Sequence, residues 1–164
     1  MNFSEISQTL GVLMQGVQFL LELKDRKENV NLIITVEKYF PDSNDNPQAL
    51  LIQLLVHNHG NQSVAVEQII LEMNGVEIGT NLISEVKTDI LGLLSVVGFQ
   101  QMFHFKINKI DTIQPLRLPI TLQPRHSTRG LALFTFPEGI DTIKSAKLRV
   151  SLNGNQVKLS KTII

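Results

Sequence analysis

The 164-residue chain contains no cysteine and few aromatic residues, and polar side chains interrupt its longest apolar stretches. The absence of cysteine excludes disulfides and thiolate metal sites, so the chain must fold by packing alone. It is also compatible with a cytoplasmic protein, which is the localisation we expect. The apolar residues are mostly Leu, Ile and Val. Such a composition suits the strands of a β-sandwich and argues against disorder.

The sequence also lacks the motifs that mark common catalytic sites. It has no G-x-S-x-G elbow, no cysteine nucleophile and no phosphate-cradling glycine loop. Ser127 directly follows His126, and neighbours on a strand point to opposite faces. The stretch Asp42–Asn46 lacks the glycine and the final glutamate of a calcium loop. We therefore expect a protein that is not an enzyme, with no catalytic residue and no cofactor.

The distribution of charge gives no sign of a nucleic-acid interface. The formal net charge is zero, with acidic residues in excess over residues 1–82 and basic residues in excess over residues 83–164. A nucleic-acid footprint also needs aromatic side chains interleaved with Lys and Arg, and the basic half has no such alternation. We expect no nucleic-acid partner.

Two Asn-Gly dipeptides, Asn74–Gly75 and Asn153–Gly154, each lie between alternating apolar runs. Asn-Gly supplies the two positive-φ residues of a type I′ turn, which joins antiparallel strands. Strands are predicted at residues 30–40, 49–58, 64–73, 115–122, 128–136, 147–152 and 156–162. Short strands with turns at these spacings favour a mainly β, antiparallel sandwich.

The two turns also predict which residues face each other across the hairpins. The pairs of interest are Leu71–Ile78, Glu72–Glu77, Leu148–Leu159 and Arg149–Lys158. Like charges directly opposite each other are destabilising. Either a wet surface tolerates these two pairs, or the acidic pair meets the basic pair, within one molecule or between subunits.

Two segments have helical spacing instead. Near the N-terminus, apolar residues recur at intervals of three and four and form an a/d seam: Phe3, Ile6, Leu10, Leu13, Val17 and Leu20. With Ser4 as a candidate N-cap, this spacing predicts an amphipathic helix from about residue 3 to 27, within an N-terminal unit of residues 1–28. A second apolar set has spacings of four, three and four: Val86, Ile90, Leu93 and Val97. It predicts a helix inserted into the sandwich at residues 82–99, with a β structure or an apolar loop as rivals.

The predicted helices suggest how the protein associates. One amphipathic helix cannot bury its own apolar seam, and symmetric dimers are the commonest closed assembly. We therefore expect a homo-oligomer, most simply a dimer, with any other protein partner unknown. The alternative is a membrane-associated accessory protein anchored by residues 3–23. The dense apolar stretch Leu10–Leu23 is only 14 residues long, whereas a spanning helix needs about 20.

One motif carries a resemblance to known proteins. The run Val56–Gly60, followed by the alternation of Val64, Val66 and Leu71, is similar to a core hairpin of immunoglobulin-like sandwich domains. These domains occur in small uncharacterised bacterial and phage-associated proteins, often after an N-terminal helix. The resemblance implies an immunoglobulin-like β-sandwich over residues 29–164 and implies no known activity.

Within that motif, His57 and His59 are two residues apart at a strand end, so both side chains share one face. They could offer two nitrogens to a metal, but a zinc site needs at least a third ligand. The sequence does not show whether His104, His126 or an acidic residue supplies it, and we expect no metal site. The sequence thus favours a non-catalytic interaction or scaffold module that self-associates, with the membrane-associated and metal-binding proteins as alternatives.

Overall fold

The computed structural model describes residues 19–25, 30–43, 48–89, 91–107, 109–137, 146–152 and 161–162. These residues form twelve strands and no helix. The strands are β1 Phe19–Asp25, β2 Val30–Pro41, β3 Ala49–Asn58, β4 Val64–Met73, β5 Val76–Gly79, β6 Ile83–Thr88, β7 Leu93–Gly98, β8 Gln101–Lys106, β9 Ile120–Leu122, β10 Ser127–Thr135, β11 Ala146–Leu152 and β12 Lys161–Thr162.

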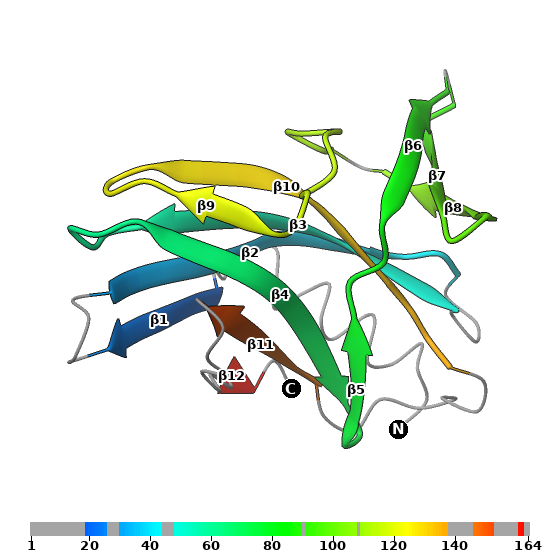
Figure 1. Cartoon of the computed structure of the whole chain (residues 1–164). Helices are drawn as coiled ribbons and strands as arrows, with labels where there is room; N and C mark the ends of the chain where they lie inside the picture. The colour runs from blue at the N-terminus through cyan, green and yellow to red at the C-terminus, as the bar shows by residue number, and fades with distance from the viewer. Residues whose placement is uncertain are drawn as a thin grey trace.

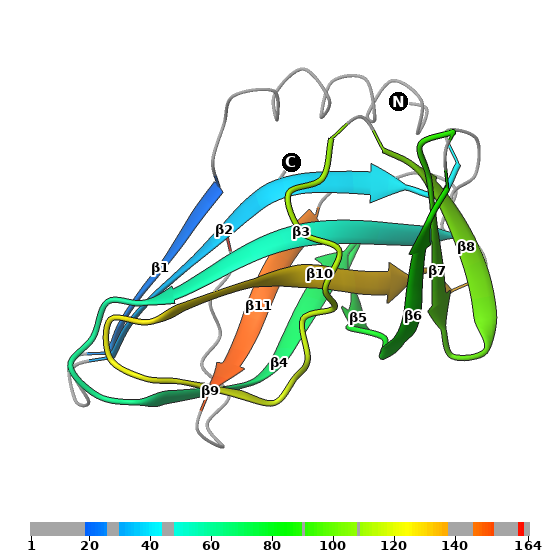
Figure 2. The same ribbon diagram turned by 90° about the horizontal axis from the view of Figure 1, so that it is seen from above.

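The strands form three antiparallel sheets (Figure 1). The first sheet has the order β1-β2-β3-β10, and the second has the order β12-β11-β4-β5, with β9 also paired to β4. A smaller third sheet, β6-β7-β8, stands at one end of the molecule. Seen from above, strands of the second sheet cross beneath those of the first (Figure 2).

The first and second sheets share one apolar core, which we call the first core. Its largest contributions come from four strands, in alternation that is interrupted only between Val66 and Ile69, where the register with β11 shifts. The residues are Leu32, Ile34 and Val36 of β2, Ile52, Leu54 and Val56 of β3, Val64, Val66, Ile69 and Leu71 of β4, and Leu148, Val150 and Leu152 of β11. Alternation places every second side chain on one face of a strand. The arrangement is mainly β with antiparallel sheets and is compatible with a β-sandwich.

Several predictions from the sequence are confirmed. The strands expected at residues 49–58 and 64–73 are β3 and β4 with the same bounds. The first Asn-Gly dipeptide forms the predicted turn, with φ of 50° at Asn74 and 82° at Gly75. Its register pairs Leu71 with Ile78 and Glu72 with Glu77, as the turn requires.

The second hairpin differs from the prediction. Asn153–Gly154 lies outside the described residues, but the pairing of β11 with β12 puts Leu148 opposite Lys161. A two-residue turn at this dipeptide places Leu148 opposite Leu159. At this point the strands are therefore shifted by two residues from the expected register.

The predicted inserted helix at residues 82–99 is wrong, because the segment forms β6 and β7 of the third sheet. Leu94 and Val96 of β7, two residues apart, are fully buried, whereas the helical pattern relied on Leu93 and Val97. Because apolar residues flank Ser95 on both sides, the segment fits both the helical period and the strand period. Short apolar runs of this kind cannot be assigned from periodicity alone.

The predicted N-terminal helix is wrong over residues 19–25, which form β1. This strand pairs with β2 along its whole length, from Phe19 opposite Val36 to Asp25 opposite Val30. Leu20 of the predicted seam is thus on a strand, and the remaining seam residues, Phe3 to Val17, lie outside the described part of the chain. Pairing with β2 satisfies the backbone of a segment whose sequence suits either structure. In the described ranges, no helix has the length and apolar character needed to cross a membrane.

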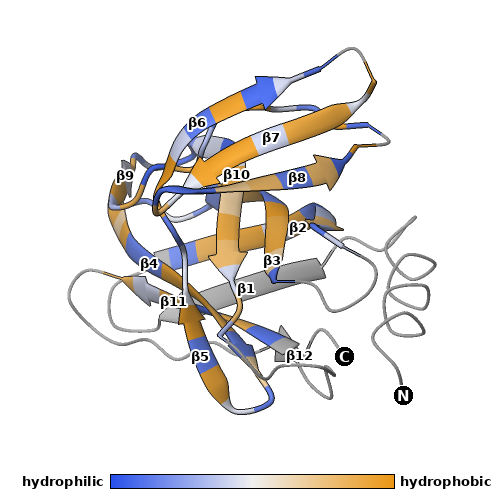
Figure 3. Cartoon of the chain, turned by 90° about the vertical axis from the view of Figure 1, so that its right-hand side faces the viewer, coloured by the Kyte–Doolittle hydropathy of each residue, from blue (hydrophilic) through white to orange (hydrophobic). Residues whose placement is uncertain are grey.

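The third sheet packs on the outer face of the first and forms a second core. This core joins Leu94, Val96, Phe103 and Phe105 of the third sheet to Ala49, Leu51, Leu131 and Leu133 of the first. Figure 3 shows the apolar residues along β7 and β8. The sheets approach closely, since a Cβ added to Gly98 would lie 2.5 Å from Leu133 Cδ2.

The segment 107–119, which connects β8 to β9, lies against β10 at a second glycine. The Leu116 amide donates to the Leu131 carbonyl at 2.8 Å, and the Leu131 amide donates to the Gln114 carbonyl at 2.9 Å. A Cβ on Gly130 would lie 2.8 Å from the backbone nitrogen of Leu116. Only glycine allows the two backbones to approach so closely.

We predict that Gly130→Ala destabilises the protein by about 1–3 kcal/mol, because the new methyl group meets backbone that cannot move aside without losing hydrogen bonds. Gly79→Ala is the matched control, since a Cβ there has nothing within 4 Å. Denaturant unfolding should show a lower midpoint for the first variant and an unchanged or higher midpoint for the second. Equal midpoints would contradict the close approach.

Candidate interaction surfaces

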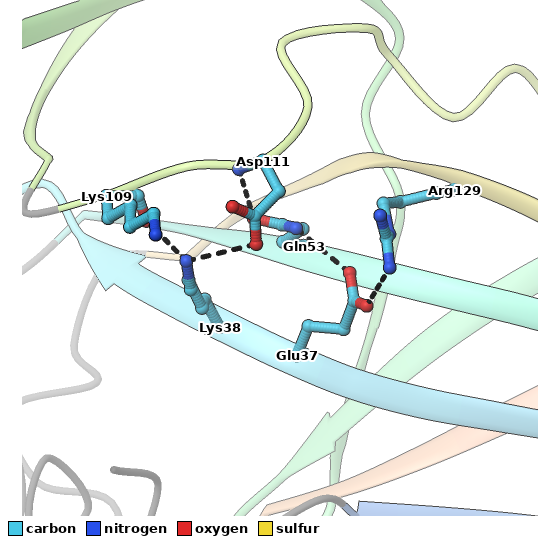
Figure 4. Close-up of polar contacts among 6 residues, drawn as sticks. All are labelled: Glu37, Lys38, Gln53, Lys109, Asp111 and Arg129. Atoms are coloured by element: carbon cyan, nitrogen blue, oxygen red, sulfur yellow. Dashed lines mark hydrogen bonds and ion pairs between the residues drawn. The ribbon is translucent and has the colours of Figure 1, made fainter.

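A bulge in β2 brings two neighbouring charged residues to the outer face of the first sheet. Val36 pairs with Leu54 and Lys38 pairs with Gln53, which leaves Glu37 as the additional residue. Such a bulge re-aims side chains, so residues that would alternate between faces can share one. Both charged side chains then reach partners on the same face of the sheet (Figure 4).

Glu37 is held between two donors. Fully buried Gln53 donates from Nε2 to Glu37 Oε2 at 2.9 Å, and Arg129 donates from its guanidinium to Glu37 Oε1 at 2.6 Å. The Glu37 side chain is 16% exposed, so the ion pair is partly shielded from water. Both oxygens of this carboxylate are bonded to neighbouring side chains, so Glu37 has a structural role.

Lys38 and Gln53 bond to the segment that connects β8 to β9 and hold it against the sheet (Figure 4). Lys38 Nζ donates to the Lys109 carbonyl at 2.8 Å and lies 3.3 Å from Asp111 Oδ2. The Asp111 amide faces Gln53 Oε1 at 3.5 Å. The hydrogen bond and the positive charge of Lys38 lower the pKa of Asp111. The network fixes the path of the segment.

On the outer face of the second sheet, one arginine resolves the like-charged pair predicted at the first turn. Arg149 of β11 contacts Glu77 and lies 3.5 Å from Glu72, both through Nη1. The Arg149 side chain is only 14% exposed. The acidic pair therefore meets a basic residue within one molecule, one of the two possibilities that the sequence left open.

We predict that Arg149→Gln lowers the free energy of unfolding by about 1–2 kcal/mol, because it removes the guanidinium that lies against both of the facing carboxylates. Glu77→Gln in that background should recover part of the loss. Lys87→Gln is the control, since the Lys87–Glu85 pair is 67% and 48% exposed and exposed pairs contribute less than about 1 kcal/mol. If the effects of Arg149→Gln and Glu77→Gln on the free energy of unfolding are additive, Arg149 does not stabilise the protein through Glu77.

The four residues predicted as a second interaction stripe do not form one. Val86 lies against the second core, and Leu93 and Val97 are half-buried on β7, adjacent to the buried Leu94 and Val96. Ile90 lies outside the described residues. The strands thus distribute the set over two faces of the third sheet.

Sequence reasoning missed a different apolar group at the β7–β8 turn, which we call the tip. Phe99 is 72% exposed, Leu82 is 71% exposed and Met102 is 56% exposed. Phe99 and Gln100 form the two-residue turn with φ of 45° and 65°. The left-handed region costs a residue with a Cβ about 1–2 kcal/mol, and this turn usually takes Asn-Gly. A strained, exposed aromatic residue at a turn suggests a role in binding.

Asn58, from the motif that carries the immunoglobulin-like resemblance, ties two loops together at one end of the first sheet. Its side chain is fully buried and donates to the carbonyls of Gln62, Leu122 and Gln123 at 2.7, 3.1 and 3.3 Å. Its Oδ1 accepts the amide of Gly60 at 2.9 Å. A buried amide satisfied in this way fixes the β3–β4 connection against the β9–β10 connection.

The two histidines of the motif lie at this end of the sheet, His57 on β3 and His59 in the β3–β4 connection. The rings of His57 and His59 lie with their centroids 4.0 Å apart and their planes tilted by 59°. Burial lowers the pKa of His57, and the charges of His59 and Arg125 lower it further. His126 Nδ1 lies 3.0 Å from the Pro124 carbonyl.

The possible third metal ligands do not gather around the pair. His104 is on β8 and its Nδ1 lies 3.1 Å from Ser95 Oγ. Within the ranges that the structure describes, no three His, Cys, Asp or Glu side chains form a group that could hold a metal ion.

We predict that the protein purified without added metal contains no stoichiometric zinc, because two imidazoles without a third ligand bind zinc weakly. Elemental analysis of the wild-type protein and of a His57→Ala, His59→Ala variant is the measurement. A stoichiometric metal content that disappears in the variant would show that another residue completes the site.

Comparison with known proteins gives no relative from which function could be transferred. No protein-family model matches the chain, and neither the curated proteins nor the solved structures provide a match.

Proposed function

We propose that the protein is a non-catalytic interaction module with an immunoglobulin-like sandwich, and that it self-associates through the tip of its third sheet. The immunoglobulin-like assignment is supported by strand order. In such sandwiches the strands A, B and E lie in one sheet, and C, F and G in the other. Here β2-β3-β10 and β4-β11-β12 follow the same two orders, with β3 continuing into β4 of the facing sheet.

The absence of a catalytic role is supported by the state of the acidic groups on the outer faces. Glu37, Asp111 and Glu72 are each engaged by a cation. General acid–base catalysis needs a group that can exchange a proton with a substrate. Paired carboxylates on a sheet surface are poor candidates for that task.

The observation that carries the self-association is Phe99. A large aromatic side chain, mostly exposed, occupies a backbone conformation that a smaller residue would adopt at lower cost. The backbone of Leu82 lies close to Gly98, the residue before Phe99, since the Leu82 carbonyl oxygen would be 3.4 Å from a Cβ on Gly98. Aromatic side chains and Met are enriched at interface cores. A second copy of this chain is the occupant we propose, since two identical tips offer the same apolar surface to each other.

The test replaces the tip residues by those that the turn prefers. We predict that Phe99→Asn with Gln100→Gly keeps or raises stability, because Asn-Gly suits a type I′ turn, and converts the protein from a dimer to a monomer in sedimentation velocity. Leu91→Ser is the matched control, since Leu91 is 86% exposed in the β6–β7 turn and lies outside the tip. It should leave the dimer intact.

Two outcomes would overturn the role of the tip. One is a wild-type protein that is monomeric at micromolar concentration. The other is a dimer that survives the tip variant but dissociates when residues 1–18 are deleted, which would assign association to the predicted seam Phe3–Val17. The deletion ends at residue 18 so that β1 is kept. Sedimentation of the full chain, and of the chain that lacks residues 1–18, with neutral lipid vesicles tests the membrane-associated alternative anchored by residues 3–23.

A further inference from the structure

We propose that His57, His59 and Arg125 form a binding site for a phosphate group at the end of the first sheet. This site is separate from the tip and does not depend on the proposed self-association. His57 lies on β3 and His59 in the β3–β4 connection, and the fold brings Arg125 of the β9–β10 connection near them.

The backbone around the site is built to hold these side chains in place. The Asn58 amide donates to the His126 carbonyl at 2.9 Å, and the Arg125 amide donates to the Asn58 carbonyl at 2.8 Å. Arg125 adopts a φ of 64°, a left-handed conformation that costs a residue with a Cβ about 1–2 kcal/mol. Its guanidinium Nη2 donates to Asn61 Oδ1 at 3.2 Å, which orients it over the same loop. The fold thus keeps an arginine where a glycine or asparagine would fit with less strain.

The chemistry of the site is that of an anion receptor. Two imidazoles with centroids 4.0 Å apart offer nitrogen donors to one small ligand, and the charge of Arg125 acts on His57. Ser127 lies directly opposite His57 in the register of β3 and β10, so its hydroxyl shares the same face. Ile33, the partner of His57 on β2, is uncharged. Arginine and protonated histidine form strong, charge-assisted hydrogen bonds to phosphate oxygens.

The electrostatics of the site point in the same direction. Burial lowers the pKa of His57, and the two neighbours that lower it further, His59 and Arg125, are both basic. A bound dianion reverses this balance, because it favours the protonated imidazoles and screens them from each other. Binding should therefore be accompanied by proton uptake and should strengthen as the pH falls through the histidine range.

The site differs from a metal site in its charge requirement. A divalent cation needs neutral imidazoles and further anionic ligands, and Arg125 would repel it. A phosphate group uses the arginine and gains from each proton that the histidines take up. Free phosphate monoesters and the headgroups of anionic lipids share this chemistry.

The experiment is a titration of the full chain with inorganic phosphate, followed through the imidazole resonances in NMR at pH 6 and pH 8. We expect saturable shifts of His57 and His59, a binding constant about 10-fold weaker at pH 8, and an upward shift of the His57 pKa on binding. Arg125→Asn, which suits the left-handed backbone, and His57→Gln should each weaken binding about 10-fold or more. His104→Gln, on the third sheet, is the matched control and should leave binding unchanged.

Three results would overturn the proposal. These are shifts that do not saturate, shifts of equal size at His104, and an affinity that Arg125→Asn leaves unchanged. Denaturant unfolding of each variant distinguishes lost binding from lost structure, since the proposal requires folded variants. Flotation with vesicles of phosphatidylcholine, with and without phosphatidic acid, distinguishes a free phosphate from a lipid headgroup as the source. The tip variant Phe99→Asn with Gln100→Gly should bind phosphate as the wild type does, so the failure of one proposal leaves the other standing.

Discussion

Burial of the first sheet on both faces is the constraint on which the rest of the structure depends. Along β10, Ala132 and Phe134 enter the first core, and Leu131 and Leu133 enter the second. Fully burying a side chain of this size contributes about 1.5–3 kcal/mol, so a strand that does this on both faces needs a cover on each side. The second sheet covers one face, and the third sheet with the segment 107–119 covers the other.

Buried polar side chains join the connecting segments to the first sheet. Gln53 is fully buried between the β2 bulge and the segment that connects β8 to β9, and its amide bonds to Glu37 and to the backbone of Asp111. Asn58 does the same at the end of β3. Buried polar groups are costly unless satisfied, and when satisfied they select one arrangement among several with similar apolar burial. These two amides therefore determine where the connecting segments run.

The surfaces proposed for function are those where the fold accepts local cost. At the tip, Phe99 adopts a left-handed backbone conformation and is exposed. In the β9–β10 connection, Arg125 also adopts a left-handed conformation, at the end of the first sheet that carries the two histidines. Both features would be avoided in a chain selected for stability alone. By contrast, Arg149 and its two glutamates form a satisfied cluster, which stabilises the second sheet and offers no free group to a ligand.

Local elements with short-range signals can be predicted from the sequence alone. Asn74–Gly75 predicts its turn and register because the two positive φ angles depend only on those residues, and β3 and β4 follow from runs bounded by turn residues. The remaining elements depend on long-range packing. Residues 82–99 satisfy a helical and a β period equally, and the pairing of β7 with β8 and the apolar face of β3 and β10 selected the strands. Pairing with β2 likewise made residues 19–25 a strand. His57 interacts electrostatically with Arg125, and Arg149 lies 3.5 Å from Glu72. In both pairs the residues are more than sixty positions apart in the sequence, and only the packing of the sheets brings them near each other.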